Sequence, residues 1–187
     1  WNAAASGDIV TAPGLWSLDN FGNTLIATIA GGETFEWDSD PTGANNTRAT
    51  ILANAPTASS FSMVSTPDRH LIFFGTETTV GTSSTRDEMF IRFSDQENIN
   101  TTSSYTPSAT NTAGTQRLAD GSKIMGAIRG RDAIYVWTDT ALFIMRFVGS
   151  PFTFSFQQVG TNCGLIGKNA AVEVDGSAYW MSENGFF

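Results

Sequence analysis

The chain has 187 residues, of which 10 are Lys or Arg and 18 are Asp or Glu, for a formal net charge of −8. This length suits one substantial domain, and the acidic balance argues against a surface built to grip nucleic-acid phosphates. Charged residues make up 15% of the chain, below the average of about 25%, so we expect a surface rich in Ser, Thr, Asn and Gly. The single cysteine, Cys163, excludes an intrachain disulfide, and no apolar run approaches the ~20 residues of a membrane span.

In chain order, a small, polar lead-in over residues 1–14 is followed by Leu15–Gly22, with a turn predicted over 19–22. From there, short apolar runs rich in β-branched and aromatic residues alternate with turns that contain Gly, Asp or Pro, which is typical of antiparallel strands. The predicted strands are Thr24–Ile29, Glu33–Trp37, Ser59–Ser65, Leu71–Gly75, Glu88–Ser94, Ile124–Ile128, Ala133–Thr138, Ala141–Val148, Phe152–Val159, Ala170–Val174 and Ser177–Met181.

Polar, turn-rich segments separate these strands. Two of them cover residues 38–48 and 76–87, and the segment 49–55 is left open between a short helix and an extended connector. The longest connector, 95–116, is polar and irregular. Loops of that length in a compact domain are usually functional or disordered.

The stretch Ile124–Val148 carries the clearest strand pattern. Gly130, Arg131 and Asp132 form its first turn, and Asp139-Thr140 form its second. Three neighbouring strands joined this tightly predict an antiparallel meander.

The plan of strand, Gly/Asp turn and aromatic-ended strand recurs along the chain. Its clearest copies are Ala133–Leu142 and Ser177–Phe186, in which Trp137 and Trp180 occupy matching positions, and weaker copies end at Trp37 and Phe74. A period of roughly 40–50 residues with about four short strands per unit is typical of a β-propeller. A β-sandwich with coincidental spacing is the alternative. We therefore predict an all-β fold of antiparallel meanders that form part of a β-propeller, with residues 1–187 as one domain or part of one.

The last three residues, Gly185-Phe186-Phe187, read as the opening of a further strand, because Ala141–Val148 follows Trp137 in the same way. An unpaired strand start at a sheet edge invites aggregation. We therefore expect this chain to be a segment of a longer protein.

Few residues suggest chemistry. His70 is the only histidine, and it follows Pro67-Asp68-Arg69 at a predicted turn, where bonding to the backbone is the simplest role. A histidine base needs a nucleophile and an orienting acid around it, and the chain has no G-x-S-x-G motif. Cys163 is expected to be a small buried thiol at a strand connection.

Carboxylates could build a glycosidase, which needs two of them about 5–10 Å apart. Candidates by residue type are Asp19, Asp68, Asp95, Asp139 and Asp175. Most of these lie in predicted turns, where Asp is expected for its backbone hydrogen bonds. The chain has no calcium-binding loop and no His/Cys cluster, and Arg129 and Arg131 flank a turn where solvation is expected. We therefore predict no enzymatic activity, metal or cofactor.

An ordered set of short blocks resembles the tail-nozzle proteins of short-tailed bacteriophages, which are labelled packaged-DNA stabilisation or virion structural proteins. The blocks are Leu15–Gly22 with Gly31-Gly32 and Trp37, Asp68-Arg69-His70, Ile91–Gln96, Asn111–Gly114 with Leu118, Trp137–Leu142, Gly149–Phe152, Cys163–Ile166 and Tyr179–Phe186. They span almost the whole chain, and one departure is Phe93, where the resemblance leads us to expect Trp.

The resemblance implies a propeller-bearing subunit of a homohexameric ring in the virion tail. That ring lies below the portal and adaptor and lines the DNA exit channel, and family members are longer than this chain. A net-negative wall suits DNA that passes without sequence-specific binding, because each absent Lys or Arg removes a phosphate contact. Side-to-side contacts in the ring could come from loops such as 95–116.

Two other functions remain open at this point. A glycan-binding propeller module would expose aromatic residues such as Trp1, Trp16 or Tyr105 in a pocket. A sialidase-like hydrolase would bring two carboxylates together at the propeller centre.

Overall fold

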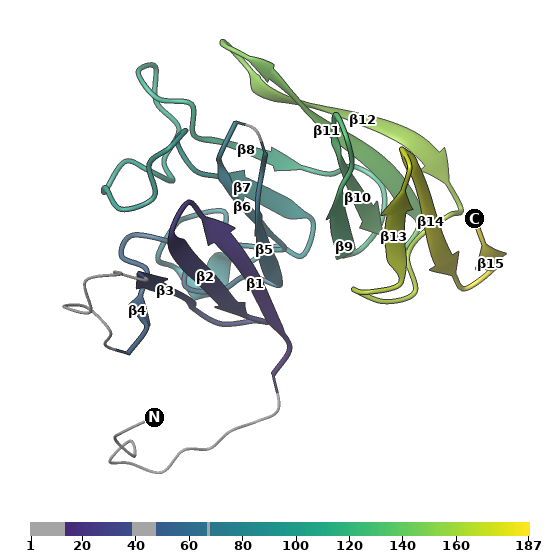
Figure 1. Cartoon of the computed structure of the whole chain (residues 1–187), viewed down its shortest axis with the longest axis horizontal. Helices are drawn as coiled ribbons and strands as arrows, with labels where there is room; N and C mark the ends of the chain where they lie inside the picture. The colour runs from purple at the N-terminus through teal and green to yellow at the C-terminus, as the bar shows by residue number, and fades with distance from the viewer. Residues whose placement is uncertain (1–13, 39–47, 67) are drawn as a thin grey trace.

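The structure is a computed structural model that describes residues 14–38, 48–66 and 68–187. Within these residues the chain is all-β apart from one short 3₁₀ helix, Ser83–Thr85, and the strands form four antiparallel sheets (Figure 1). Sheet 1 contains β1 (Trp16–Phe21), β2 (Thr24–Ile29), β3 (Thr34–Asp38) and β4 (Thr50–Ile51). Sheet 2 contains β5 (Phe61–Val64), β6 (Leu71–Phe74), β7 (Phe90–Phe93) and β8 (Gly114–Arg117). Sheet 3 contains β9 (Ile124–Arg129), β10 (Ile134–Thr138), β11 (Ala141–Gly149) and β12 (Thr153–Thr161). Sheet 4 contains β13 (Ala171–Val174), β14 (Ser177–Ser182) and β15 (Gly185–Phe186).

Every sheet is a meander, because strands that are neighbours in the sequence are also neighbours in the sheet. The predicted all-β fold of antiparallel meanders is therefore confirmed. The predicted central meander is β9–β11, in which β10 pairs with both of its neighbours. The predicted last strand is also present, since Phe186 pairs with Met181 as β15.

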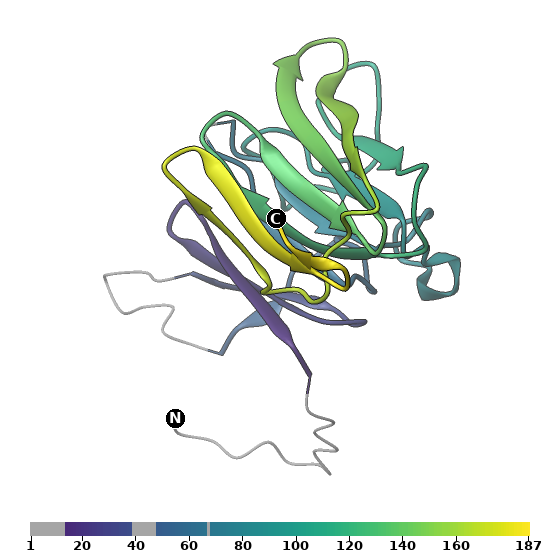
Figure 2. The ribbon, with the colours of Figure 1, turned by 90° about the vertical axis from the view of Figure 1, so that its right-hand side faces the viewer.

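The sheets follow one another in space as they do along the chain, and an apolar cluster separates each pair. Ile26, Val64 and Phe73 belong to the cluster between sheets 1 and 2. Phe74, Ile91, Val136 and Phe143, among others, fill the space between sheets 2 and 3. Trp137, Leu165 and Trp180 pack between sheets 3 and 4. Figure 2 views the molecule from the side of sheet 4, which lies at the end of this series.

The first strands of the sheets lie close to a common line. Strand β1 contacts β5, and β9 contacts β13. Arg129, at the end of β9, donates a hydrogen bond to the backbone oxygen of Val64, at the end of β5, at 3.1 Å. Consecutive sheets therefore meet along their first strands, while the predicted propeller stays a prediction.

Strand β8 lies inside the predicted loop 95–116 and was missed, because Gly114–Arg117 is short, polar and largely exposed. It pairs with β7, and Gly114 lies opposite Phe93. A Cβ atom on Gly114 would lie 2.2 Å from the ring of Phe93. Only glycine therefore lets this buried ring lie across the edge strand.

Three other local predictions need correction. The predicted turn over 19–22 starts too early, because Asp19 and Asn20 pair with β2 inside β1. The segment 49–55, for which the sequence allowed either a short helix or an extended connector, contains the strand β4. Trp37 lies in the third strand of its sheet, whereas Trp137 lies in the second, so the two are not equivalent positions. Almost all of the lead-in 1–14 and most of the loop 38–48 lie outside the described residues.

Filling the space at Gly114 should test the packing of β8. We expect Gly114→Ala to lower the free energy of unfolding by about 1–3 kcal/mol, the usual cost of overpacking, because the ring of Phe93 has to move. The measurement is the urea midpoint at constant m-value. Gly167→Ala is the matched control, since no atom lies within 4 Å of its added Cβ. Equal midpoints for both variants would contradict the close contact.

Candidate functional site

The only histidine lies at the centre of a buried hydrogen-bonded chain. The side chain of His70 has 0% exposure, and its Nδ1 lies 2.9 Å from Oδ2 of Asp68. The same carboxylate oxygen accepts a hydrogen bond from the hydroxyl of Ser65 at 2.7 Å. On the other side of the ring, Nε2 lies 3.2 Å from Oγ1 of Thr112. The expected role of a turn histidine that bonds the backbone is therefore wrong for its ring, which has side-chain partners.

Thr112 extends this chain to a second aspartate. Its backbone N–H and its hydroxyl both donate to Oδ1 of Asp95, at 2.9 and 2.8 Å. The chain Asp68–His70–Thr112–Asp95 thus joins the turn before β6, the end of β7 and the segment before β8. Two of the carboxylates predicted by residue type are therefore connected, although through His70 and Thr112 rather than directly.

The order of acid, imidazole and hydroxyl is that of a hydrolytic triad, but the geometry does not permit that chemistry. The one hydroxyl proton of Thr112 goes to Asp95, so the hydroxyl is not activated toward a substrate. The imidazole also packs against the rings of Phe93 and Phe154, with centroids 6.3 and 5.1 Å away. A fully buried ring offers no surface to a substrate, so we interpret the chain as a structural clamp.

The clamp holds its carboxylates ionised. Burial disfavours the charged form of Asp68, but hydrogen bonds from His70 and Ser65 outweigh this and hold the pKa of Asp68 below the ordinary 3.8. Burial likewise disfavours the charged form of Asp95, and hydrogen bonds from Thr112 and Gln96 lower its pKa. Hydrogen bonding to the charged form is the cause in both cases.

A second buried polar pair, Glu77 and Arg92, was not identified from the sequence. Glu77 is 0% exposed, and its carboxylate accepts hydrogen bonds from the backbone N–H groups of Thr57, Gly81 and Thr82 and from the Thr57 hydroxyl. The guanidinium of Arg92 donates to the backbone oxygens of Tyr105, Glu77 and Thr78, at 2.6, 3.2 and 2.8 Å. Burial lowers the pKa of Arg92, while the charge of Glu77 opposes that shift.

No pattern in the sequence indicated that these two residues are buried. Glu77 stands in a run of Thr and Gly that reads as a solvated loop, and Arg92 alternates with apolar residues along β7 as an exposed residue would. Their buried hydrogen bonds attach the loops 76–87 and 95–113 to sheet 2.

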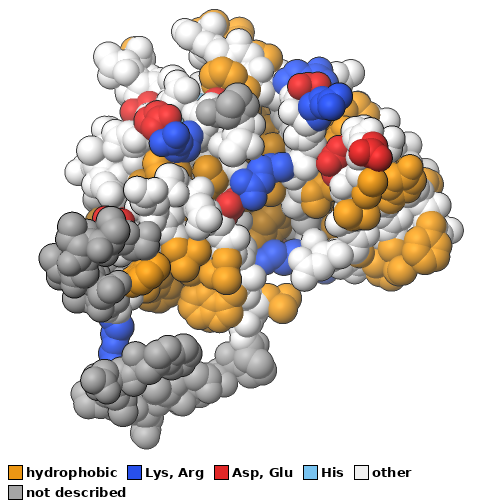
Figure 3. All heavy atoms as spheres, viewed as in Figure 1, with side chains coloured by type: hydrophobic (Ala, Val, Ile, Leu, Met, Phe, Trp, Pro, Cys, Tyr) orange, Lys and Arg blue, Asp and Glu red, His pale blue; other side chains and the backbone are white. Residues whose placement is uncertain are grey.

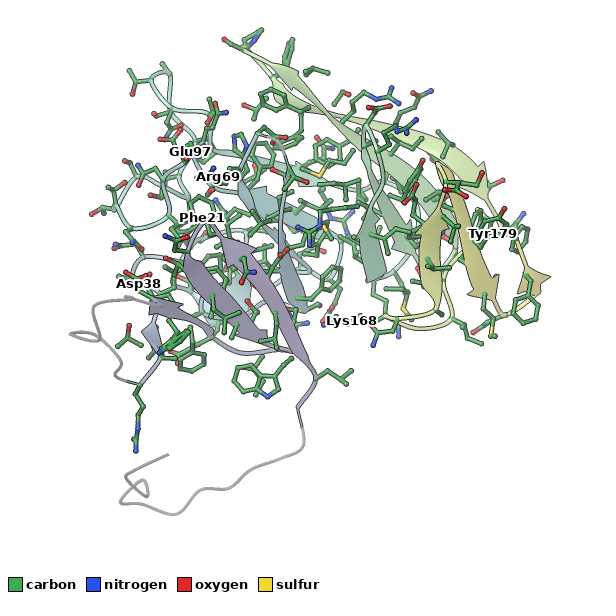
Figure 4. All side chains as sticks on the ribbon, viewed as in Figure 1. Phe21, Asp38, Arg69, Glu97, Lys168 and Tyr179 are labelled. Carbon is green, nitrogen blue, oxygen red and sulfur yellow. The ribbon has the colours of Figure 1, made fainter. Side chains whose placement is uncertain are left out.

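A groove of about 320 Å³ lies where the first strands of the sheets approach one another. Residues of β1, β5 and β9 and of the segment before β13 line it, including Trp16, Asp19, Phe61, Met63, Arg129 and Lys168. Figure 3 shows Lys and Arg side chains in the hollow between the N-terminal and C-terminal sheets, and Figure 4 places Lys168 there.

The two cations of the groove differ in their surroundings. Arg129 makes an ion pair with Asp19, at 3.1 Å between Nη2 and Oδ1. The ammonium of Lys168 lies 5.4 Å from the ring centroid of Phe61 and 3.5 Å from the backbone oxygen of Trp16. Burial lowers the pKa of Lys168. The side chain of Arg129 is 40% exposed, as a solvated turn residue would be, and it also joins β9 to β1 and β5.

The remaining candidates of the sequence analysis are dispersed. Asp139 accepts hydrogen bonds from the N–H and the hydroxyl of Ser122, and these lower its pKa against the opposing effect of burial. Asp175 occupies the tight turn between β13 and β14, with a φ of 51°. Cys163 is buried, as predicted, and burial raises the pKa of its thiol. Of the three aromatic candidates, Trp16 is 48% exposed, Tyr105 is 1% exposed, and Trp1 lies outside the described residues.

Within the described ranges 14–38, 48–66 and 68–187, no group of three or more His, Cys, Asp or Glu side chains is placed to hold a metal ion. In the same ranges no helix has the length and apolar character needed to cross a membrane.

Comparison with known proteins adds information on the fold alone. No protein-family model matches the chain, and neither does a curated protein. Among solved structures, the crystal structure of the computationally designed Ika4 protein is similar, with a TM-score of 0.52 and 10% sequence identity. The similarity covers 96% of this chain and 94% of that one.

The aspartates with lowered pKa predict loss of stability in acid. Asp68, Asp87, Asp95 and Asp139 all have a pKa below 3.8 in the folded chain. Their contribution is therefore present above the unfolded value and is lost as the pH falls through the folded pKa values. We expect the urea midpoint to drop between pH 7 and pH 3, and to drop less in Asp95→Asn.

The control for that measurement is Asp132→Asn, at an exposed turn position. This variant should keep the acid sensitivity of the unmodified chain. Identical pH dependence in Asp95→Asn and in the unmodified chain would contradict the ionised state of the clamp.

Proposed function

We propose that the protein is a structural, non-enzymatic subunit of a bacteriophage tail nozzle. In this function, six copies form a ring that continues the DNA exit channel below the portal and adaptor and helps to retain packaged DNA. The proposal begins from the ordered sequence blocks that resemble this family. It is supported by the ion pairs that four arginines of the described surface make with carboxylates, and by the burial of Asp68 and His70.

The ion pairs between arginines and carboxylates are the observation that best supports the proposal. Four of them make ion pairs with carboxylates, with N···O distances of 2.7 to 3.1 Å. The pairs are Arg69–Glu97, Arg86–Glu88, Arg117–Asp87 and Arg129–Asp19. Figure 4 shows Arg69 and Glu97 side by side at the surface. A fifth, Arg92, is buried against backbone oxygens.

Ion pairing of this kind suits a wall past which DNA slides. DNA affinity depends on Lys and Arg side chains that displace counterions from phosphates. An arginine that already has a carboxylate partner gains less from a phosphate, and the net charge of −8 repels the polyanion at longer range. The described surface therefore favours passage of DNA over retention by adhesion, so retention would come from the assembled ring.

The decisive experiment is a cryo-EM reconstruction of the particle or complex that contains this chain. The proposal expects six copies around a central channel in line with the portal. A monomer, or a location outside the tail, would overturn it.

Low adhesion to DNA can be measured separately. We expect no binding of the purified chain to a fluorescent 30-bp duplex at low salt. In the double variant Glu88→Lys/Glu97→Lys, the exposed Arg69 and the half-buried Arg86 lose their partners and two cations are added, so salt-dependent binding should appear. Glu88→Gln/Glu97→Gln, which adds no cations, is the control and should bind less than the Lys variant. Tight binding by the unmodified chain would contradict a low-adhesion wall.

One observation favours a glycan-binding module as the second candidate. The ring of Phe61 and the ammonium of Lys168, 5.4 Å apart, both line the groove, so an aromatic residue and a cation lie in one cavity. The sialidase-like version has less support, because Asp19, the carboxylate that lines the groove, is paired with Arg129. The nozzle function expects no signal on a glycan array, whereas binding that Lys168→Gln abolishes would favour the module.

A further inference from the structure

The hydrogen bonds of the clamp require a proton on both nitrogens of the His70 ring. The ring is 0% exposed, and its Nδ1 lies 2.9 Å from Oδ2 of Asp68. Asp68 is held ionised, so its oxygens only accept hydrogen bonds and Nδ1 is the donor. A neutral imidazole has a single N–H group. A neutral ring that bonds Asp68 in this way would therefore carry a bare lone pair on Nε2.

The Thr112 hydroxyl has no proton to offer to such a lone pair. Its oxygen lies 2.8 Å from Oδ1 of Asp95, which also only accepts, so the one hydroxyl proton is directed at Asp95. The backbone N–H of Gln96 donates to the same hydroxyl oxygen at 2.8 Å. The remaining lone pair of Thr112 faces Nε2 of His70 at 3.2 Å. Two lone pairs at this distance would repel each other, whereas an N–H group on Nε2 completes the chain.

The charges of the clamp favour the same protonation state. Asp68 is buried and Asp95 is half-buried, and both are ionised. With a neutral ring, the clamp would hold two negative charges and no positive one in a region with little water. Buried charge is costly unless an opposite charge is paired with it. An imidazolium between the two aspartates provides that charge.

The other surroundings of the ring are apolar or carry both signs of charge. Aromatic rings of three strands enclose the imidazole at centroid distances of 5.1 to 6.3 Å: Phe93, Phe147 and Phe154. Next to His70 in the chain, Arg69 is paired with Glu97. Beyond Asp68, three charged side chains line a hollow of about 210 Å³ together with it: Arg129, Arg131 and Asp132. The hydrogen-bonded aspartates therefore dominate the protonation state of the ring.

Thr112 is the point at which the connector between β7 and β8 is attached to its neighbours. Its N–H and its hydroxyl bond Asp95, after the end of β7. Its backbone oxygen accepts a hydrogen bond from the hydroxyl of Thr153, at the start of β12, at 3.0 Å. Figure 1 shows this connector as the teal loops that extend from β7 and β8. The bond from Nε2 of His70 to Thr112 therefore holds the connector to β6, and it depends on one proton.

We infer that His70 is a buried imidazolium at neutral pH and acts as a proton-dependent lock, in which Nε2–H holds Thr112 and the segment before β8. When the pH rises, hydroxide removes the Nε2 proton, and the bond to Thr112 becomes a repulsion. The contribution of His70 to stability is thus present while the ring carries both protons and is lost as the pH rises. Asp68 and Asp95 act in the opposite direction, because their contribution is lost as the pH falls. The lock is internal to the chain and does not depend on the proposed function.

Nitrogen NMR of the ring measures its protonation state directly. His70 is the only histidine, so the ring signals of ¹⁵N-labelled protein belong to it. The two nitrogens of an imidazolium have similar shifts, whereas a neutral ring has one nitrogen far downfield of the other. We expect similar shifts at pH 7.5, where an unperturbed histidine, with a pKa of about 6.5, is mostly neutral. One nitrogen far downfield at pH 7.5 would overturn the inference.

The partner of Nε2 is tested with Thr112→Val, which removes the hydroxyl and keeps the shape of the side chain. We expect the ring to lose its second proton at a pH about 1–2 units lower than in the unmodified chain, as for the loss of one hydrogen bond to a charged group. Thr115→Val is the matched control, because Thr115 is exposed in β8. The same titration of the ring in both variants would rule out Thr112 as the partner.

Hydrogen exchange tests whether the proton locks the connector. Once the ring has lost its second proton, the amides of Gln96 and Thr112 should lose protection severalfold, after correction for the intrinsic pH dependence of exchange. The amides of β6 are the internal control and should keep their protection. Unchanged protection of Gln96 and Thr112 across the titration of the ring would show that the proton does not hold the connector, which would overturn the lock.

Discussion

The burial of one sheet face against the next is the interaction on which the rest of the structure depends. A meander of four short strands cannot bury its apolar face alone, and it becomes stable when a neighbouring sheet covers it. Phe74 and Phe143 meet between sheets 2 and 3, and Trp137 and Trp180 meet between sheets 3 and 4, with ring centroids 5.5 Å apart. Each sheet is therefore held by its neighbours, and the outer faces of sheets 1 and 4, the two end faces, are the surfaces where this stacking stops within the described residues.

Buried polar groups give the stacked sheets a single arrangement of loops. The clamp of Asp68, His70, Thr112 and Asp95 attaches the segment before β8 to sheet 2. Glu77 and Arg92 attach two further loops by bonding their backbone groups. A buried polar group without a partner is costly, so these side chains allow few alternatives to the observed loop paths. The acid, imidazole and hydroxyl of Asp68, His70 and Thr112 resemble a catalytic triad, but they serve to hold loops together, because aromatic rings enclose the imidazole.

The surface divides into parts of different character. Arg69, Arg86 and Arg117 are paired with carboxylates, which suits a wall that does not hold DNA. The end faces carry no charged strand residue, which suits contact with another sheet. The groove at the inner strands combines an aromatic wall with a half-buried lysine. Paired arginines and uncharged end faces suit a subunit of an assembly. The groove, with its aromatic residue and its lysine, suits a binding module.

The sequence by itself determined the secondary structure and its order. Alternation, turn residues and aromatic positions located β2, β6, β9, β10 and β11 closely, because these signals act between residues near one another in the chain. The recurring unit also indicated the succession of meanders. Strand β8 was not predicted, because a short polar edge strand has no apolar pattern. Its position depends on the ring of Phe93, which lies across Gly114.

Only the tertiary structure decided which polar residues meet. Asp68 and His70 are close in the sequence, but Thr112 and Asp95 join them through loops of different strands. Arg129 of sheet 3 makes an ion pair with Asp19 of sheet 1, although the two residues are far apart in the sequence. Glu77 is buried in a segment whose composition is that of a solvated loop. Local patterns fix which face of a strand is apolar, but the partner of a buried charge depends on which segments the stacking of sheets brings together. That is the physical reason why the strands could be read from the sequence and the clamp, the groove and the two end faces could not.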